Sequence, residues 1–136
     1  MKGFFISVFC LVFSVILLSG CGVEKYDDTK VGDLDFTLLS EEDIPKQVME
    51  VINESKSENF RKTYTDNDYL YIIIGYGAQP TTNYSIVIED LYEAPNAIFV
   101  SSMLKGPSKQ EEVVKKETYP YVVLKLKYND KTVIFK

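Results

Sequence analysis

The run YLYIII at residues 69–74 consists only of aromatic, leucine and β-branched side chains. Asp66-Asn67-Asp68 precedes it, and Gly75 and Gly77 follow it, so turn-forming residues lie on both sides. No polar residue alternates with the apolar ones, which is typical of a strand covered on both faces. The run therefore predicts the central strand of a sheet.

Further strands are predicted towards the C-terminus. Apolar and polar residues alternate over 84–91, and a third run at 98–104 ends before Gly106-Pro107. Alternation returns over 122–128, and Asn129-Asp130 predicts a tight turn that brings the chain back as a last strand over 131–135.

One helix is predicted before these strands. Ser40 is a candidate N-cap, acidic residues occupy 41–43, and the helix should end near Ser57. Its buried stripe is Ile44, Val48, Val51, Ile52 and Ser55. The predicted fold is α+β: one N-terminal helix packed on a curved, mostly antiparallel sheet or small barrel of five to six strands, in a single domain over 36–136.

Composition excludes several functions. The chain has 136 residues, 20 acidic against 15 basic side chains and a net charge of −5, which argues against nucleic-acid binding. It has no histidine, which excludes Ser-His-Asp and Cys-His catalysis and histidine-ligated metal sites. The candidate acids Asp66, Asp68, Glu89, Asp90 and Glu93 form no catalytic or calcium-binding pattern. We expect no enzymatic activity, no cofactor and no metal.

The N-terminus carries an export signal. Lys2 precedes the apolar run FFISVFCLVFSVILL at 4–18, which is short for a membrane span and typical of a signal peptide. Leu18-Ser19-Gly20-Cys21 then has the pattern of a bacterial lipoprotein cleavage site. The alternatives are a plain secretory signal with an incidental cysteine, and an uncleaved anchor.

This pattern predicts a signal peptide over 1–20 and a lipid-modified Cys21, carrying palmitate-type acyl chains, as the mature N-terminus. Several acyl chains anchor a protein durably in a bilayer. Residues 21–35 are polar and should form a flexible tether. We therefore expect a protein held on the extracytoplasmic face of the cell membrane, without a disulfide in its mature domain, since Cys10 leaves with the signal.

A loop after the central strand carries a family resemblance. Gly75 and Gly77 are followed by Pro80-Thr81 and by Tyr84, and Pro107 and Tyr119-Pro120-Tyr121 come later. This order resembles the PrcB-type protease-complex subunit family over about residues 69–123. Thr82-Asn83 stands where that family usually has two glycines. The resemblance implies an accessory lipoprotein that assembles with an exported, subtilisin-like protease.

Side chains beside the predicted turns are the candidates for contact with this partner. Tyrosine offers a large contact area at low entropic cost, and proline and glycine stiffen or shape the turns. The predicted partner-binding residues are Tyr76, Pro80, Thr81, Thr82, Asn83, Tyr84, Pro107 and Tyr119.

Two other functions stay open. The segment from Pro80 to Tyr84 is also similar to the wedge loop of chagasin-type cysteine-peptidase inhibitors, although the chain has no tryptophan. A solute-binding lipoprotein is the other alternative, and it would need a deep apolar pocket with converging polar groups.

Overall fold

The computed structural model describes residues 26–136. The predicted signal peptide and Cys21 lie outside these described residues. Within residues 26–136, no helix is long and apolar enough to cross a bilayer.

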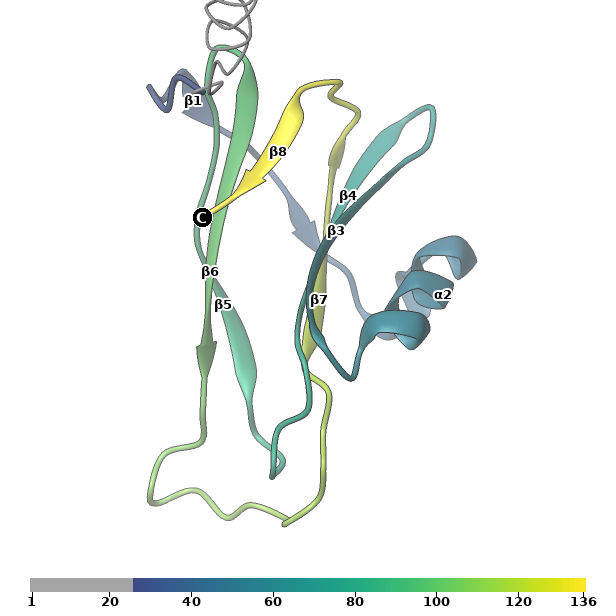
Figure 1. The fold of residues 1–136 in the computed structure, drawn as a ribbon, viewed down its shortest axis with the longest axis vertical. Helices are drawn as coiled ribbons and strands as arrows, with labels where there is room; N and C mark the ends of the chain where they lie inside the picture. The colour runs from purple at the N-terminus through teal and green to yellow at the C-terminus, as the bar shows by residue number, and fades with distance from the viewer. Residues whose placement is uncertain (1–25) are drawn as a thin grey trace, which may run out of the picture.

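Two four-stranded sheets, which we name A and B, face each other (Figure 1). Sheet A has the strand order β1 (Gly32–Asp33), β5 (Ser85–Glu93), β6 (Ala97–Lys105) and β8 (Thr132–Phe135). Sheet B has the order β2 (Thr37–Leu38), β7 (Tyr121–Lys127), β4 (Tyr69–Tyr76) and β3 (Asn59–Thr65).

The α+β class and the mostly antiparallel pairing predicted from the sequence are confirmed. The prediction of one curved sheet or a small barrel is wrong, because the strands form two open sheets and no closed barrel in residues 26–136. The predicted five to six strands become eight, of which β1 and β2 have two residues each. Such short strands have too few residues to show an alternating pattern.

The core between the sheets explains why the run at 69–74 is apolar throughout. Leu70, Ile72 and Ile74 point towards sheet A, whereas Tyr71 and Ile73 point towards the helix on the other face. The buried residues of sheet A and β7 that complete the core are Leu91, Ile98, Val100, Leu124 and Leu126. β4 is thus covered on both faces, as its sequence predicts.

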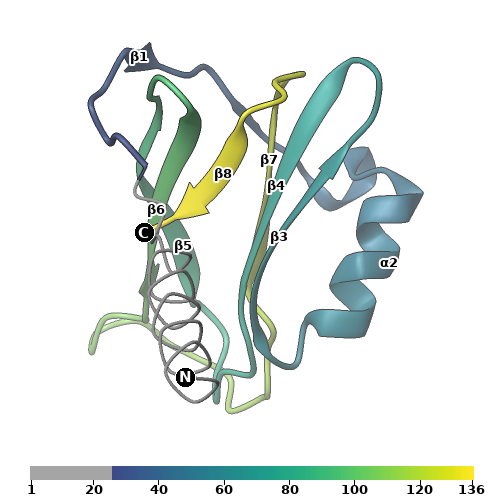
Figure 2. The same cartoon turned by 45° about the horizontal axis from the view of Figure 1, so that its top comes forward.

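The helix α2 spans Lys46–Ser55 and covers sheet B only (Figure 2). Val48 and Ile52 on its inner face are fully buried, which stabilises the fold by about 1.5–3 kcal/mol for each side chain. Its predicted start at Ser40 is wrong, because Glu41–Asp43 form a separate 3₁₀ turn. Ile44, which precedes Pro45, has ψ 125°, since proline disfavours the helical conformation in the residue before it.

The last strand does not pair with the strand that precedes it. β8 crosses to sheet A and pairs in parallel with β6, in the register Ile98 with Val133 and Val100 with Phe135. β7 already has β4 on one side and β2 on the other, so neither of its edges is available. The turn at Asn129-Asp130 therefore connects the two sheets instead of closing a hairpin.

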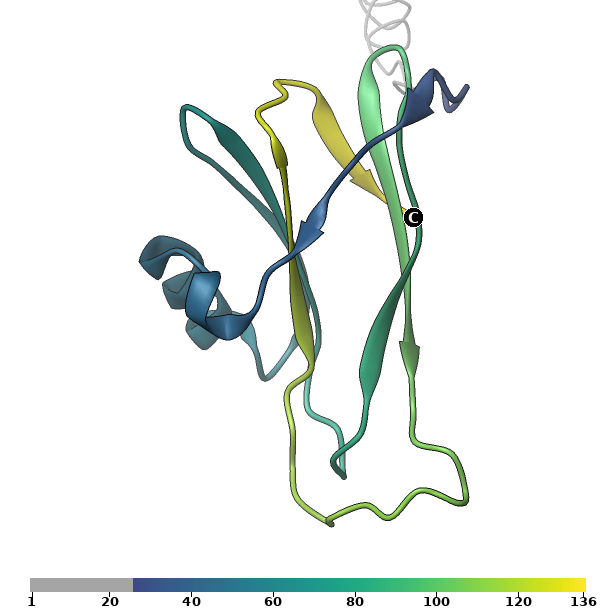
Figure 3. The ribbon, with the colours of Figure 1, turned by 180° about the vertical axis from the view of Figure 1, so that it is seen from behind.

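Part of the predicted tether belongs to the folded sandwich. Gly32–Asp33 pair with the end of β5, and the chain then crosses to sheet B to form β2 (Figure 3). Leu34, in this crossing, packs against the core between the sheets.

Candidate functional site

Two loops lie together at one end of the sandwich, opposite β1 (Figures 1 and 3). The first joins β4 to β5 over residues 77–84, and the second joins β6 to β7 over residues 106–120. We call them the loop pair. The second loop is long for a connection without a helix or strand, and loops of about 12–15 residues or more are usually functional or linker segments. Seven of the eight predicted contact residues lie in the loop pair, and Tyr76 lies at the end of β4 beside it.

A short ladder joins the two loops. The backbone N–H of Gln79 donates to the carbonyl of Thr118 at 2.8 Å, and that of Thr118 donates back to Gln79 at 2.9 Å. The Thr118 hydroxyl also donates to the carbonyl of Thr81 at 2.7 Å. These bonds tie the centre of the first loop to the end of the second.

Thr82 and Asn83 extend this connection. The N–H of Thr82 donates to the carbonyl of Val114 at 3.1 Å, and the N–H of Val114 donates to the Thr82 hydroxyl at 3.0 Å. The Asn83 amide donates to the carbonyl of Glu112 at 3.1 Å. Asn83 has φ 71°, a conformation that asparagine tolerates better than most residues. The two residues that depart from the family pattern thus hold the second loop in place.

Aromatic side chains support the loop pair from below. Tyr84 is half-buried, and a Cβ atom added at Gly106 would lie 3.3 Å from its ring, so the ring packs closely on the second loop. Pro107, next to this contact, is also half-buried. Tyr119 lies under the Lys56 ammonium, 5.4 Å from its ring centroid, and the negative charge of Glu117 raises the pKa of the Tyr119 phenol.

Tyr76 joins the two sheets next to the loop pair. Its hydroxyl is 2.7 Å from the Ser102 hydroxyl on β6, and the Arg61 guanidinium lies 4.4 Å from its ring centroid. Its side chain is half-buried between these partners. Of the predicted contact residues, Pro80 and Asn83 are the exposed ones, and the others support the loops from within.

The sequence analysis missed two exposed apolar residues of the second loop. Val113 and Val114, on the second loop, are 37% and 63% exposed. They follow no helical or strand periodicity, so pattern reasoning did not select them. The sequence feature that could have identified them is a pair of valines within the charged segment between Pro107 and Pro120. Like Pro80 in the first loop, they are exposed apolar residues of the loop pair.

A known family covers the strands that carry the loop pair. The family model described as PrcB C-terminal covers β4, β5, β6 and β7, and therefore both loops of the pair. Residues 70–127 match the PrcB C-terminal family. The resemblance predicted from the sequence is confirmed over these residues. Comparison with curated proteins and with solved structures finds no significant match.

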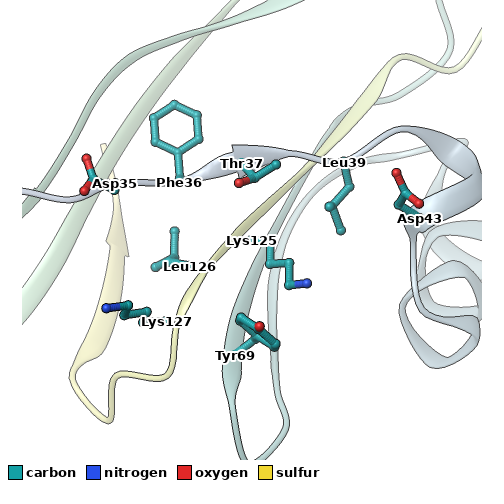
Figure 4. A pocket seen from close by; sticks show the side chains of 9 residues that line it. All are labelled: Asp35, Phe36, Thr37, Leu39, Asp43, Tyr69, Lys125, Leu126 and Lys127. Carbon is teal, nitrogen blue, oxygen red and sulfur yellow. The ribbon is translucent and has the colours of Figure 1, made fainter.

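A surface depression of about 540 Å³ lies between β2 and the neighbouring ends of β4 and β7 (Figure 4). Lys125 fills part of it, with its ammonium 3.9 Å from the ring centroid of Tyr69. The carboxylates of Asp35 and Asp43 lie at opposite ends and do not converge (Figure 4). The depression thus lacks the converging polar groups that a solute site requires.

Asp66-Asn67-Asp68 forms a turn between β3 and β4. The Asp66 carboxylate accepts the backbone N–H groups of Asp68 at 2.9 Å and of Tyr69 at 2.7 Å, and these bonds lower its pKa. Residues 26–136 contain no group of three or more acidic or cysteine side chains placed to hold a metal ion.

Proposed function

We propose that this protein is a membrane-anchored accessory subunit of an exported, subtilisin-like protease complex, and that the loop pair is its docking surface. The protein acts by assembly: acyl chains on Cys21 hold it on the extracytoplasmic face, and the loop pair contacts the protease. Its contribution to the complex is binding and not catalysis.

The observation that carries this proposal is the cross-bonding of the two loops inside the family-matched segment. A surface held rigid before binding loses less conformational entropy when a partner docks. Pro80, Val113 and Val114 supply its apolar contacts, and the exposed charged residues Glu111 and Lys115 flank the two valines in the second loop. An apolar centre with a polar rim is the usual anatomy of a protein interface.

The position of the loop pair suits a lipid-anchored protein. Cys21 precedes β1 by eleven residues, which span at most about 40 Å when fully extended. β1 lies at the opposite end of the sandwich from the loop pair (Figure 1). Anchoring through Cys21 therefore leaves the loop pair accessible to a partner outside the membrane.

The docking surface is tested by a pair of matched substitutions. Val114→Asp places a charge in the loop pair, whereas Val31→Asp places one at the opposite end on a side chain of similar exposure, 65% against 63%. Crosslinking in intact cells, followed by affinity purification through the C-terminus and mass spectrometry, should recover a subtilisin-like protease with the parent and with Val31→Asp. We expect the amount of protease recovered with Val114→Asp to be at least tenfold lower.

Three results would contradict the proposal. The protein could be recovered alone under mild detergent, the two aspartate variants could retain the protease equally, or the purified protein could inhibit papain-like peptidases through Pro80 and Tyr84. The anchor is tested separately with Cys21→Ser, which should abolish incorporation of labelled palmitate and release the protein from the membrane fraction.

A further inference from the structure

The two long sides of the sandwich differ. On one side the chain crosses from β1 to β2 and covers the core with Leu34 (Figure 3). On the other side β3 and β8 are edge strands of different sheets. A groove of about 380 Å³ runs between them, and Leu70, Val133 and Phe135 supply its apolar lining. We call it the edge groove.

The backbone of β3 faces this groove with unpaired groups. The N–H of Asp66 donates to the carbonyl of Tyr69 at 3.1 Å, so this pair is hydrogen-bonded. Hydrogen-bonded pairs alternate along an antiparallel ladder, and the register from β3 to β4 is regular. The N–H and C=O groups of Arg61, Thr63 and Thr65 therefore point away from β4. These residues also line the edge groove.

The backbone of β8 has the same property on the opposite wall. The N–H of Lys136 donates to the carbonyl of Val100 on β6 at 2.8 Å. The alternate residues Val133 and Phe135 therefore direct their backbone groups away from β6. Two strand edges with unpaired backbone groups thus flank an apolar lining, which is the arrangement that accepts an added strand.

Arg61 supplies a cation at one end of the groove. All its hydrogen bonds leave from Nη1, to Asn59 Oδ1 at 2.7 Å and to the carbonyls of Phe60 at 2.9 Å and Gly75 at 2.8 Å. Within residues 26–136 no carboxylate lies within ion-pair distance of it. Its Nε and Nη2 donors have the fork geometry that holds a carboxylate through two hydrogen bonds.

The other end of the groove carries one carboxylate. Asp130 lines it and makes no ion pair in the described part of the chain, whereas its neighbour Lys131 is bound to Glu93 at 2.8 Å. A strand running antiparallel to β3 would begin beside Asp130 and finish beside Arg61. This polarity matches a peptide with a positive N-terminal end and a negative C-terminal end. The groove lining stops at Arg61 and does not continue into the loop pair, so the added strand would end there.

We propose that the edge groove binds the C-terminal segment of a partner polypeptide as an extra strand antiparallel to β3, with its terminal carboxylate on Arg61. The site is separate from the loop pair, and it does not require that the partner be a protease. Backbone hydrogen bonds to Thr63 and Thr65 supply affinity, and the apolar lining accepts alternate side chains of the added strand.

The test uses the full chain in detergent micelles and three synthetic peptides. The probe is acetyl-Lys-Thr-Val-Thr-Val-Thr-Val with a free C-terminal carboxylate, seven residues long like β3. The second peptide is its C-terminal amide, and the third has proline at the central position. Binding is followed by fluorescence anisotropy, and its location by amide chemical shifts and hydrogen exchange.

We expect the acid peptide to bind saturably, with slowed exchange at Arg61, Thr63 and Thr65. The amide peptide should bind about tenfold more weakly, because it lacks the charge-assisted pair. Arg61→Gln should remove this difference, and the exposed control Lys105→Gln should preserve it. Thr63→Pro deletes an outward N–H without touching the β3–β4 ladder, so it should weaken binding while the melting temperature stays close to that of the parent.

Other outcomes would overturn the inference. These are equal affinity for acid and amide, undiminished binding of the proline peptide, peptide-induced shifts confined to the loop pair, or no saturable binding. Concentration-dependent dimerisation that Thr63→Pro abolishes would instead assign the β3 edge to a second copy of this chain.

Discussion

The contact between Gly75 and Phe60 provides the sharpest test of the packing under α2. Gly75 lies within β4, and a Cβ atom at this position would be 2.1 Å from Cε1 and 2.6 Å from Cδ1 of the Phe60 ring. The ring is 8% exposed and packs with Val48 and Ile52 of the helix. Gly75→Ala therefore forces either the ring or the strand to move.

The expected loss follows from these distances. Carbon atoms in contact are about 3.5–4.0 Å apart, so the ring must retreat by about 1.5 Å into packed surroundings. Overpacking of this kind costs about 1–3 kcal/mol. For a domain of this size, that lowers the melting temperature by about 4–12 °C. The direction of the stability change is informative. At an open strand position, replacing glycine by alanine usually stabilises a protein by about 0.5–1 kcal/mol, whereas here we expect a loss.

The assay is thermal unfolding followed by circular dichroism, with two further variants. Gly32→Ala is the matched control, since its added Cβ would have no atom within 4 Å, and it should leave the melting temperature unchanged or slightly raised. In a Phe60→Leu background the Gly75→Ala penalty should fall to less than half, because the clashing ring atoms are gone. A penalty that survives Phe60→Leu, or a Gly75→Ala protein as stable as the parent, would refute the argument.

The other predictions concern the loop pair, one ion pair and the link between the sheets. Asn83→Gly should be more stable than Asn83→Ala by about 1 kcal/mol in urea unfolding, because only glycine adopts φ 71° without strain; equal stabilities would contradict the left-handed conformation. Hydrogen bonding from Lys131 lowers the pKa of the Glu93 carboxyl below its usual 4.5. The ionised carboxylate therefore stabilises the fold above pH 4.5, and this stabilisation is lost as the pH falls through the lowered pKa. Glu93→Gln should therefore be less stable than the parent at pH 7, and the gap should narrow as the pH falls below 4.5; a pH-independent gap would count against the ion pair. Tyr76→Phe removes the 2.7 Å hydrogen bond to Ser102 and should cost about 0.5–1.5 kcal/mol in urea unfolding, and no loss would indicate that the bond does not form in solution.

The sequence predicts the central strand and the loop that carries most of the candidate contact residues. The run at 69–74 is apolar at every position, and the structure covers it on both faces. The motif from Pro80 to Tyr84 indicates the loop and its family from the sequence alone, because turn residues encode their local conformation directly. The match over 70–127 confirms that resemblance.

The sequence did not reveal which strands become neighbours. The pattern of 131–135 identifies a strand. It pairs with β6 in the other sheet because both edges of β7 are already occupied, and this is visible only in the tertiary structure. Similarly, Gly75 reads as a turn residue, whereas the fold uses it to make room for the Phe60 ring.

Local patterns therefore determined the longer strands of the C-terminal part, the loop after the central strand and the predicted lipid anchor, since each depends on neighbouring residues alone. Tertiary structure decided the pairing of the sheets, the bonds from Thr82 and Thr118 that join the two loops, and the open groove beside Arg61. These features join segments that are far apart in the chain. Their energies depend on which surfaces remain unpaired after the rest of the molecule has packed, and no single segment contains that information.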